Sequence, residues 1–251
     1  MVKCILGVCV KMSDLIEDKK IIVCDFHSHI LPCVDDGARD FDESIELIES
    51  VFRQGIRVLY ATPHYYPRKE SGEIKEVYTE LLCKLRESNP NTADSMQIVL
   101  GQELVYHSEL VECIRSGRAL TMGESRHVLI EFDSNIRYQD MYSQLRELVS
   151  AGYIPVIAHV ERYDALKTED NVIDLRRMGC LMQMNYDSIM GIDILGQKSK
   201  LPLVLNSKVK RVRNMVLDGY IDCFGTDMHR RDFRPPNITD SLEWLQNNIY
   251  E

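Results

Sequence analysis

Residues 40–62 read DFDESIELIESVFRQGIRVLYAT, a helix pattern joined to a strand pattern by one glycine. Asp40 and Glu43 indicate a capped helix start, and apolar residues recur at helical spacing from Ile45 to Phe52. Gly55 then ends the helix, because glycine readily takes the left-handed conformation that this position requires. The apolar run that follows predicts a buried strand.

The same join occurs three more times in the chain. Gly152 precedes YIPVIAH, Gly179 precedes CLMQMN and Gly219 precedes YIDCFGTD. With three further strands, the seven strands are nearly all followed by a helix, which favours a parallel sheet. We predict one α/β domain, a TIM-like barrel of seven strands, with an open doubly wound sheet as the alternative. The further strands are expected at residues 21–27, 96–103 and 127–132, and further helices near residues 73–88, 138–151, 169–178, 207–218 and 236–249.

Composition limits the class of protein. The 251 residues include 39 acidic and 30 basic ones, and the net charge of −9 argues against a protein that coats nucleic acid. The eight cysteines form no C-x-x-C pair, which favours a reduced, cytoplasmic protein over a disulfide scaffold. No apolar run approaches the roughly 18 residues of a membrane span. Residues 1–20 are expected to be an N-terminal extension, a leader or a docking segment, before a barrel at residues 21–251.

Ionisable side chains gather where the predicted strands end, which is where parallel barrels place their chemistry. Every predicted strand except the sixth, which ends at Asn185, ends beside an imidazole or a carboxylate. Five of the seven histidines occupy these ends, as a shared site would require. The side chains are those of Asp25, His27, His29, His64, Glu103, Glu131, His159, Asp227 and His229.

Most of these side chains are typical metal ligands. In the triplet from His27 to His29, the alternation of an extended chain puts both imidazoles on one face. Asp227 and His229 repeat that spacing. Imidazole and carboxylate ligands without thiolate suit Mn, Fe or Zn, and several carboxylates suit neighbouring ions that share a ligand.

Other motifs have two readings. The loop LPCVDDGAR at residues 31–39 could add a carboxylate ligand or form only a polar turn. Glu103 and Glu131 could bind metal or pair with buried arginines. Cys33 and Arg39 match the C-x5-R pattern of cysteine-dependent phosphatases, but two aspartates inside that loop would repel a phosphate. We therefore reject Cys33 as a nucleophile.

Neighbouring divalent ions with a metal-activated hydroxide are suited to in-line attack on phosphorus. A phosphate substrate also needs cationic side chains, and Arg162, three residues after His159, and Arg234, after the last strand, are candidates. Either arginine could instead form a surface or structural ion pair. The sequence thus predicts metal-assisted attack on a phosphate substrate.

The ordered motifs of the chain resemble those of the PHP (polymerase and histidinol phosphatase) superfamily. They are DFHSHILPCVDDGARDFDESIELI, ATPHY, AHVERYDAL and TDMHRRDFRPP, and they run from about Ile21 to the C-terminus. Within the superfamily they look like the manganese-dependent bacterial protein tyrosine phosphatases of capsule and exopolysaccharide clusters. The resemblance implies a distorted (β/α)7 barrel, three Mn²⁺ ions, and a substrate that is the phosphotyrosine-rich tail of a bacterial tyrosine autokinase.

The resemblance also implies roles for individual residues. Two positions depart from the family pattern: Cys33 stands where glycine is expected, and Gln102 stands where a small residue commonly precedes the bridging glutamate. Both departures concern loop geometry, and every implied ligand is present. The implied ligands are His27, His29, Glu103 and Asp227 for one ion, Glu103, Glu131 and His159 for a second, and Asp36, His64 and His229 for a third, with Arg162 and Arg234 on the phosphate.

Three other functions stay open. A histidinol-phosphate phosphatase or another phosphoesterase of the superfamily would share the ligands but need a closed, acidic pocket. An amidohydrolase or a TatD-like nuclease also has an HxH motif after its first strand, although it does not ordinarily combine it with the D-x-H and DDG motifs found here. A non-catalytic binding protein is opposed by the complete ligand set, since a degenerate site would be expected to lose a ligand.

Overall fold

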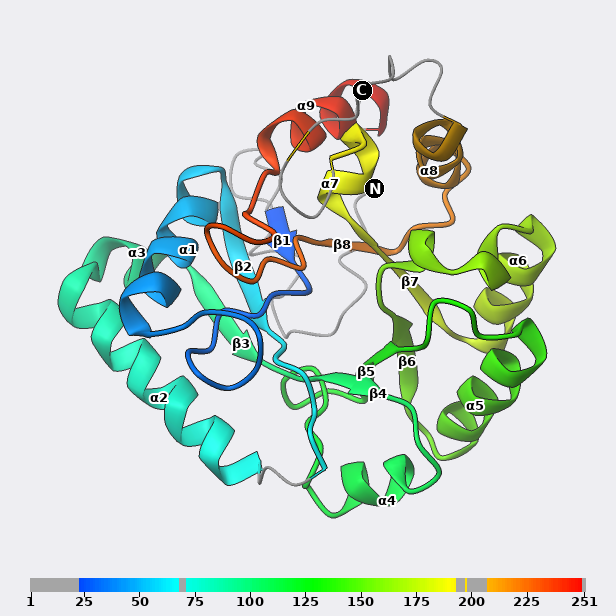
Figure 1. Ribbon diagram of the computed structural model, residues 1–251, viewed down its shortest axis with the longest axis horizontal. Coiled ribbons are helices and arrows are strands. Elements are labelled where there is room, and N and C mark those ends of the chain that lie inside the picture. The colour runs from blue at the N-terminus through cyan, green and yellow to red at the C-terminus, as the bar shows by residue number, and fades with distance from the viewer. Residues whose placement is uncertain (1–22, 68–70, 193–196, 198–206, 250–251) are drawn as a thin grey trace, which may run out of the picture.

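Parallel strands and helices alternate along the chain in the computed structural model, which describes residues 23–67, 71–192, 197 and 207–249 (Figure 1). The predicted extension at residues 1–20 lies outside the described residues. The strands are β1 (Val23–Asp25), β2 (Ile56–Ala61), β3 (Gln97–Leu100), β4 (Glu103–Val105), β5 (His127–Glu131), β6 (Ile154–Ile157), β7 (Leu181–Asn185) and β8 (Cys223–Gly225).

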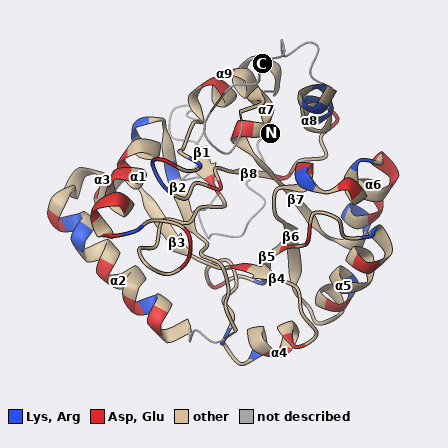
Figure 2. Cartoon of the chain, viewed as in Figure 1, with Lys and Arg blue, Asp and Glu red and all other residues tan. Residues whose placement is uncertain are grey.

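Helices surround these strands and carry charged residues of both signs on their outer faces (Figures 1 and 2). All the helices expected from sequence are present, to within a few residues. Three short helices, α3, α4 and α7, were not expected, because five or six residues are too few to show helical periodicity. None of the described helices is long and apolar enough to cross a membrane. The helices are α1 (Phe41–Arg53), α2 (Ser71–Ser88), α3 (Pro90–Ser95), α4 (Leu110–Arg115), α5 (Tyr138–Ser150), α6 (Glu169–Met178), α7 (Tyr186–Met190), α8 (Ser207–Leu217) and α9 (Thr239–Ile249).

The unit at residues 40–62 forms as predicted. The Asp40 side chain caps α1 by accepting a hydrogen bond from the backbone N–H of Glu43 at 2.8 Å. Such a cap stabilises a helix by about 1 kcal/mol. Gly55 has φ of 105°, the left-handed conformation that lets the chain leave α1 and enter β2 at once.

The sheet differs from the prediction of one closed seven-stranded barrel. The described strands form two parallel sheets, ordered β1-β2-β3 and β4-β5-β6-β7-β8. The predicted strand at residues 96–103 is broken between β3 and β4, where the Gln102 side chain is fully buried and accepts a hydrogen bond from the backbone of Leu120. The backbone N–H of Glu103 still donates to the carbonyl of Pro63, beyond β2, at 3.1 Å.

Backbone hydrogen bonds nevertheless cross both gaps between the two sheets. Beside β1 and β8, the N–H of Phe26 donates to the carbonyl of Phe224 at 3.0 Å. Beyond β2 and β4, the N–H of Tyr65 donates to the carbonyl of Glu103 at 2.9 Å. The carboxyl ends of the strands are therefore kept close together, although the described strands form no closed sheet.

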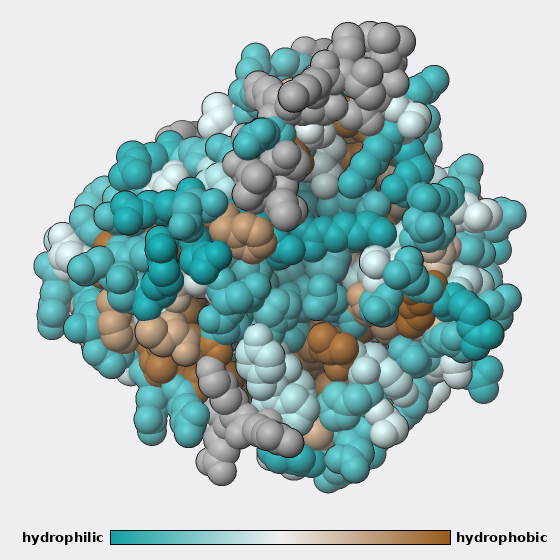
Figure 3. Space-filling view, in the orientation of Figure 1, coloured by the Kyte–Doolittle hydropathy of each residue, from teal (hydrophilic) through white to brown (hydrophobic). Residues whose placement is uncertain are grey.

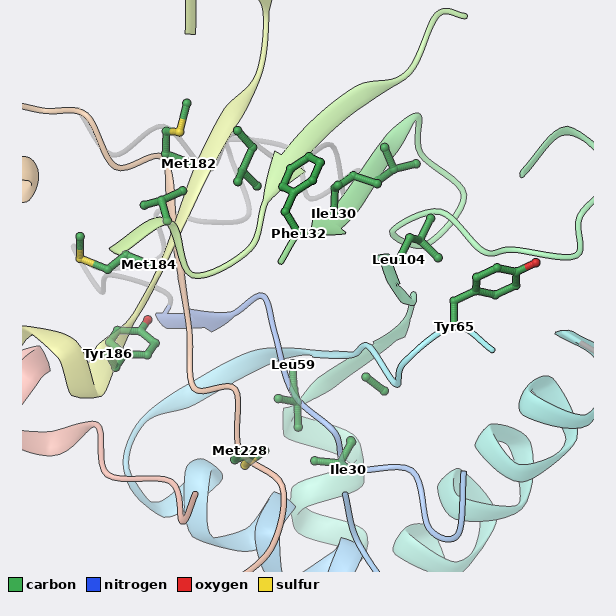
Figure 4. Packing of buried hydrophobic residues seen from close by; sticks show 14 of the residues in the cluster. Ile30, Leu59, Tyr65, Leu104, Ile130, Phe132, Met182, Met184, Tyr186 and Met228 are labelled. Atoms are coloured by element: carbon green, nitrogen blue, oxygen red, sulfur yellow. The ribbon is translucent and has the colours of Figure 1, made fainter. Parts of the chain in front are cut away.

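Two apolar clusters stabilise this arrangement. The larger one fills the space between strands and helices, and Figure 4 shows part of it, including Leu59, Ile130 and Met184. The smaller one is built mainly by the strands themselves, from Phe26, Val58, Tyr60, Met122, Leu129, Val156, Ala158 and Cys223.

Candidate metal centre

The structure brings all nine predicted metal ligands together beyond the carboxyl ends of the strands. Figure 3 shows hydrophilic residues gathered in the middle of this face. The side chains form four overlapping groups, and within each group the ligand atoms lie within 4.8 Å of one another. The groups are His29, Asp36, His64 and His229; His27, Glu103 and His159; His27, His29 and Asp227; and His64, Glu103 and Glu131.

The most buried set is formed by His27, His29, Glu103 and Asp227. The two Nε2 atoms of His27 and His29 are 3.1 Å apart. Oε2 of Glu103 lies 3.2 and 3.4 Å from these nitrogens, and Oδ1 of Asp227 lies 3.6 and 3.5 Å from them. Ligands of a tetrahedral ion with bonds of about 2.1 Å are roughly 3.4 Å apart. The four atoms thus have the spacing of a metal coordination shell.

The imidazole of His29 is held by a carboxylate on the side away from this set. Its Nδ1 lies 2.7 Å from Oδ2 of Asp35 and donates to that carboxylate. In the neutral ring this leaves Nε2 unprotonated, facing the oxygens of Glu103 and Asp227. Burial lowers the pKa of His29, but Asp35 and Glu103 outweigh burial and raise this pKa well above its usual value. Geometry and electrostatics both favour a positive charge here, as a bound cation would supply.

Glu103 lies at the centre of the cluster. Its Oε1 is 3.1 Å from Nε2 of His159, and its Oε2 is 3.1 Å from Nδ1 of His64. Burial raises the pKa of Glu103, but His27, His159 and His29 outweigh it, so the pKa falls well below its usual value. The ion-pair partners of this carboxylate are imidazoles, which decides against the arginine-partner reading and suits a ligand shared by two ions.

Glu131 lies beside His159 and His64. Its Oε1 lies 3.3 Å from Nε2 of His159, and its Oε2 lies 3.9 Å from Nδ1 of His64. His159 itself has φ of 33°, a left-handed conformation that is strained for a residue with a Cβ. The backbone therefore bends at the end of β6 in a way that carries the imidazole toward Glu103 and Glu131.

The two adjacent aspartates after β1, Asp35 and Asp36, face different partners. Asp36 is 58% exposed, and its Oδ1 lies 3.6 Å from Nε2 of His64 and 3.5 Å from Nε2 of His229. Asp35 instead faces inward and accepts hydrogen bonds from His29 and from the backbone N–H of His64 at 2.8 Å. Sequence reasoning noted the pair but missed the role of Asp35. Only the turn decides which of two adjacent carboxylates faces inward.

Gly37 allows that turn. A Cβ at this position would lie 2.1 Å from the carbonyl oxygen of His29, a steric clash that excludes any residue with a side chain. The Gly37 N–H also donates to Oδ1 of Asp35 at 2.9 Å. Glycine is required here because the loop folds directly back on His29.

The two predicted phosphate-binding arginines both contact Asp227. Arg162 donates to Oδ2 of Asp227, and Nη1 of Arg234 lies 3.2 Å from both carboxylate oxygens. Burial raises the pKa of Asp227, but Arg162, His27 and Arg234 outweigh it and lower the pKa well below its usual value. The arginine side chains remain 29% and 26% exposed, so each has one side on the candidate ligands and one open to solvent.

The C-x5-R motif does not form a phosphate cradle. The thiol of Cys33 donates to the carbonyl of Arg39 at 2.9 Å. The guanidinium of Arg39 binds both carboxylate oxygens of Glu43, at 2.8 and 2.9 Å. This supports the rejection of a cysteine nucleophile. Cys33 also has φ of 58°, which explains why glycine was expected at its position.

Comparison with known proteins places this site in a family. The family described as "Capsular polysaccharide synthesis, CpsB/CapC" matches residues 23–251. The tyrosine-protein phosphatase CpsB of Streptococcus pneumoniae is 35% identical over 221 residues, which are 87% of this chain and 88% of that protein. The tyrosine-protein phosphatase YwqE of Bacillus subtilis (strain 168) is 33% identical over 175 residues, 67% of this chain and 66% of that protein.

Solved structures agree with these relatives. One solved structure has a TM-score of 0.76 to this chain at 27% identity, over 91% of this chain and 88% of the other. It belongs to work on YwqE from Bacillus subtilis and CpsB from Streptococcus pneumoniae, described as unique metal-dependent tyrosine phosphatases. A variant of an organophosphorus hydrolase from Deinococcus radiodurans has a TM-score of 0.51 at 14% identity, over 90% of this chain and 86% of the other. At that identity the second likeness concerns the fold alone.

Proposed function

The chain belongs to the CpsB/CapC family of capsular polysaccharide synthesis, and on this basis we propose that it is a metal-dependent protein tyrosine phosphatase. The observation that carries the proposal is the convergence of nine imidazole and carboxylate side chains in four overlapping groups. The names of its relatives, which are tyrosine-protein phosphatases, support the choice of phosphotyrosine as substrate.

The ligand set suits two or three Mn²⁺ ions, because imidazoles and carboxylates without thiolate are the donors that such ions accept. When bound, the ions would activate water as a nucleophile and neutralise charge on the phosphate. We assign the ligands as the resemblance implies: His27, His29, Glu103 and Asp227 for one ion, Glu103, Glu131 and His159 for a second, and Asp36, His64 and His229 for a third.

The two arginines would bind the substrate phosphate. Arg162 and Arg234 both reach the carboxylate of Asp227, so their guanidinium groups already lie where an anion beside the ligands would be. Guanidinium groups form paired hydrogen bonds with phosphate oxygens and retain their charge at all relevant pH values. Their role is to orient the phosphate and to stabilise the charge that develops on its oxygens.

A distorted (β/α)7 barrel is the fold that we propose for this site. If β3 and β4 count as one interrupted strand, seven strands remain. The hydrogen bond from Phe26 to Phe224 and that from Tyr65 to Glu103 support continuity across both gaps.

We further propose that the substrate is the phosphotyrosine-rich tail of a bacterial tyrosine autokinase. A segment of another protein can reach only a site that is open to solvent, and the partial exposure of Arg162, Arg234 and Asp36 supports such access.

Phosphate release from a phosphotyrosine peptide tests the proposal. The purified protein would be stripped with a chelator and reloaded with Mn²⁺, beside a phosphoserine peptide and histidinol phosphate. We expect phosphotyrosine hydrolysis that disappears with chelation and returns with Mn²⁺. A preference for histidinol phosphate would contradict the substrate, and activity that does not depend on metal would contradict the mechanism.

A further inference from the structure

Strand β7 brings two amide side chains, those of Gln183 and Asn185, to the candidate site. Gln183 is fully buried and Asn185 is 4% exposed, and both lie beside the candidate ligands. We infer that β7 supplies positioning residues for the metal centre, with Gln183 orienting His27 and His159, and Asn185 orienting Asp227. The inference rests on the proposed metal-dependent function.

The orientation of the Gln183 amide follows from one backbone contact. The N–H of His159 lies 2.8 Å from the Gln183 side chain and can only donate a hydrogen bond. The atom that faces it must therefore be the oxygen, Oε1. The contact also ties Gln183 to the strained backbone of His159, whose φ is 33°.

The same oxygen determines the tautomer of His27. Nδ1 of His27 lies 3.1 Å from Oε1 of Gln183, so Nδ1 must carry the proton of this contact. In the neutral ring Nε2 is then unprotonated, and this is the atom that lies 3.2 Å from Glu103. Gln183 thus presents the ligand nitrogen of His27 in the form that binds a metal ion.

The NH2 group of Gln183 orients a third candidate ligand, Asp227, through Asn185. Nε2 of Gln183 donates to Oδ1 of Asn185 at 3.0 Å, which leaves the Asn185 amide nitrogen to face the other way. That nitrogen donates to Oδ2 of Asp227 at 3.1 Å. Each amide group in the chain from His159 to Asp227 therefore has one allowed orientation.

Close packing confines this chain of amides. At Gly225, on the neighbouring strand β8, a Cβ would lie 3.0 Å from Nε2 of Gln183 and 2.6 Å from Cβ of His27. The absence of a side chain there lets β8 approach both residues. Mutation of a residue that orients a metal ligand from outside the coordination shell typically weakens metal binding by about 10–100-fold.

The test is the affinity for Mn²⁺ of the full-length protein, measured by calorimetry after chelation. Gln183→Met keeps the length of the side chain and removes its hydrogen bonds. Gln102→Met is the matched control, because Gln102 is also fully buried and accepts a backbone hydrogen bond from Leu120, and among the described residues it forms no hydrogen bond with a candidate ligand. We expect Gln183→Met to weaken Mn²⁺ binding by about 10–100-fold, and Gln102→Met by less than about threefold. Equal affinities in the two variants would overturn the inference.

A second variant, Gln183→Glu, distinguishes loss of ligand positioning from a general loss of protein stability. Its carboxylate can still accept from His27 and from the backbone of His159 but cannot donate to Asn185, so we expect it to recover only part of the affinity that Gln183→Met loses. A Glu variant that binds Mn²⁺ as weakly as the Met variant, while its metal-free form unfolds at the same temperature as wild type, would contradict the role assigned to Gln183. Failure of the wild-type protein to bind Mn²⁺ would instead contradict the proposed function.

Discussion

Two buried regions built from the same strands are made in opposite ways. The smaller apolar cluster, which includes Leu129 and Val156, stabilises the fold by burial of apolar surface. This hydrophobic contribution does not depend on the direction of individual contacts. A few residues further along, Glu103 and Asp227 are equally buried but charged, and each is surrounded by groups that must point in one direction. Burying ionised groups costs free energy unless each is paired.

Backbone strain in this protein is concentrated at the candidate site. The residues with a positive φ that are not glycine are Cys33, His159, Asp227 and Arg234 among the described residues, and all lie in the segments that follow strands at the site. A strained conformation of this kind costs on the order of 1–3 kcal/mol. The apolar cluster beneath offsets such costs, so the site can be specialised for chemistry rather than for stability.

The largest effect is expected from removing a ligand that both arginines share. Asp227→Ala should lower phosphotyrosine turnover by more than about 10³-fold, because it deletes a metal ligand and frees Arg162 and Arg234 from their partner. His159→Ala should have a similar effect. Steady-state kinetics with Mn²⁺ present would measure both, and circular dichroism should report a near-intact fold. A variant with the wild-type rate would remove its residue from the mechanism.

A smaller loss is expected when a phosphate-binding group is removed and the ligands remain. Arg234→Met should lower kcat/KM by about 10²–10³-fold, the range typical of losing one group that stabilises transition-state charge. Mn²⁺ affinity should stay within a few-fold of wild type. A loss of Mn²⁺ binding as large as the loss of activity would show that Arg234 acts only through Asp227.

The opposite pattern is expected in the apolar cluster. Val156→Ala removes two buried methyl groups from a side chain with no exposed surface, which should lower the free energy of unfolding by about 2 kcal/mol. Urea denaturation measures this loss. Turnover at 25 °C should stay within about twofold of wild type, since burial in this cluster does not orient a ligand. A large loss of turnover would mean that the two buried regions are coupled.

The smallest effect is expected at Cys33. Its thiol contacts the backbone of Arg39 and is exposed, and Arg39 is bound to Glu43. Cys33→Ser should therefore leave Mn²⁺-dependent turnover unchanged within experimental scatter. Abolished turnover in this variant would restore the cysteine-dependent mechanism that the loop geometry argues against.

Sequence patterns were sufficient for the αβ units and for predicting which side chains meet at the candidate site. Helical periodicity and Gly55 located α1 and β2, because both signals are local along the chain. The ligands His27, His29 and Asp227 could be predicted because parallel strands bring their carboxyl ends to one place. The break between β3 and β4 was not predicted; there the Gln102 side chain bonds to the backbone of Leu120, a residue distant in sequence.

The sequence by itself thus determined which residues could bind metal, since residue type and strand position are readable one segment at a time. Tertiary structure alone decided how they are oriented: that Asp35 rather than Asp36 faces His29, and that Gln183 faces His27. The physical reason is that hydrogen bonds are short and directional, so their partners are chosen by the packing of segments far apart in the chain.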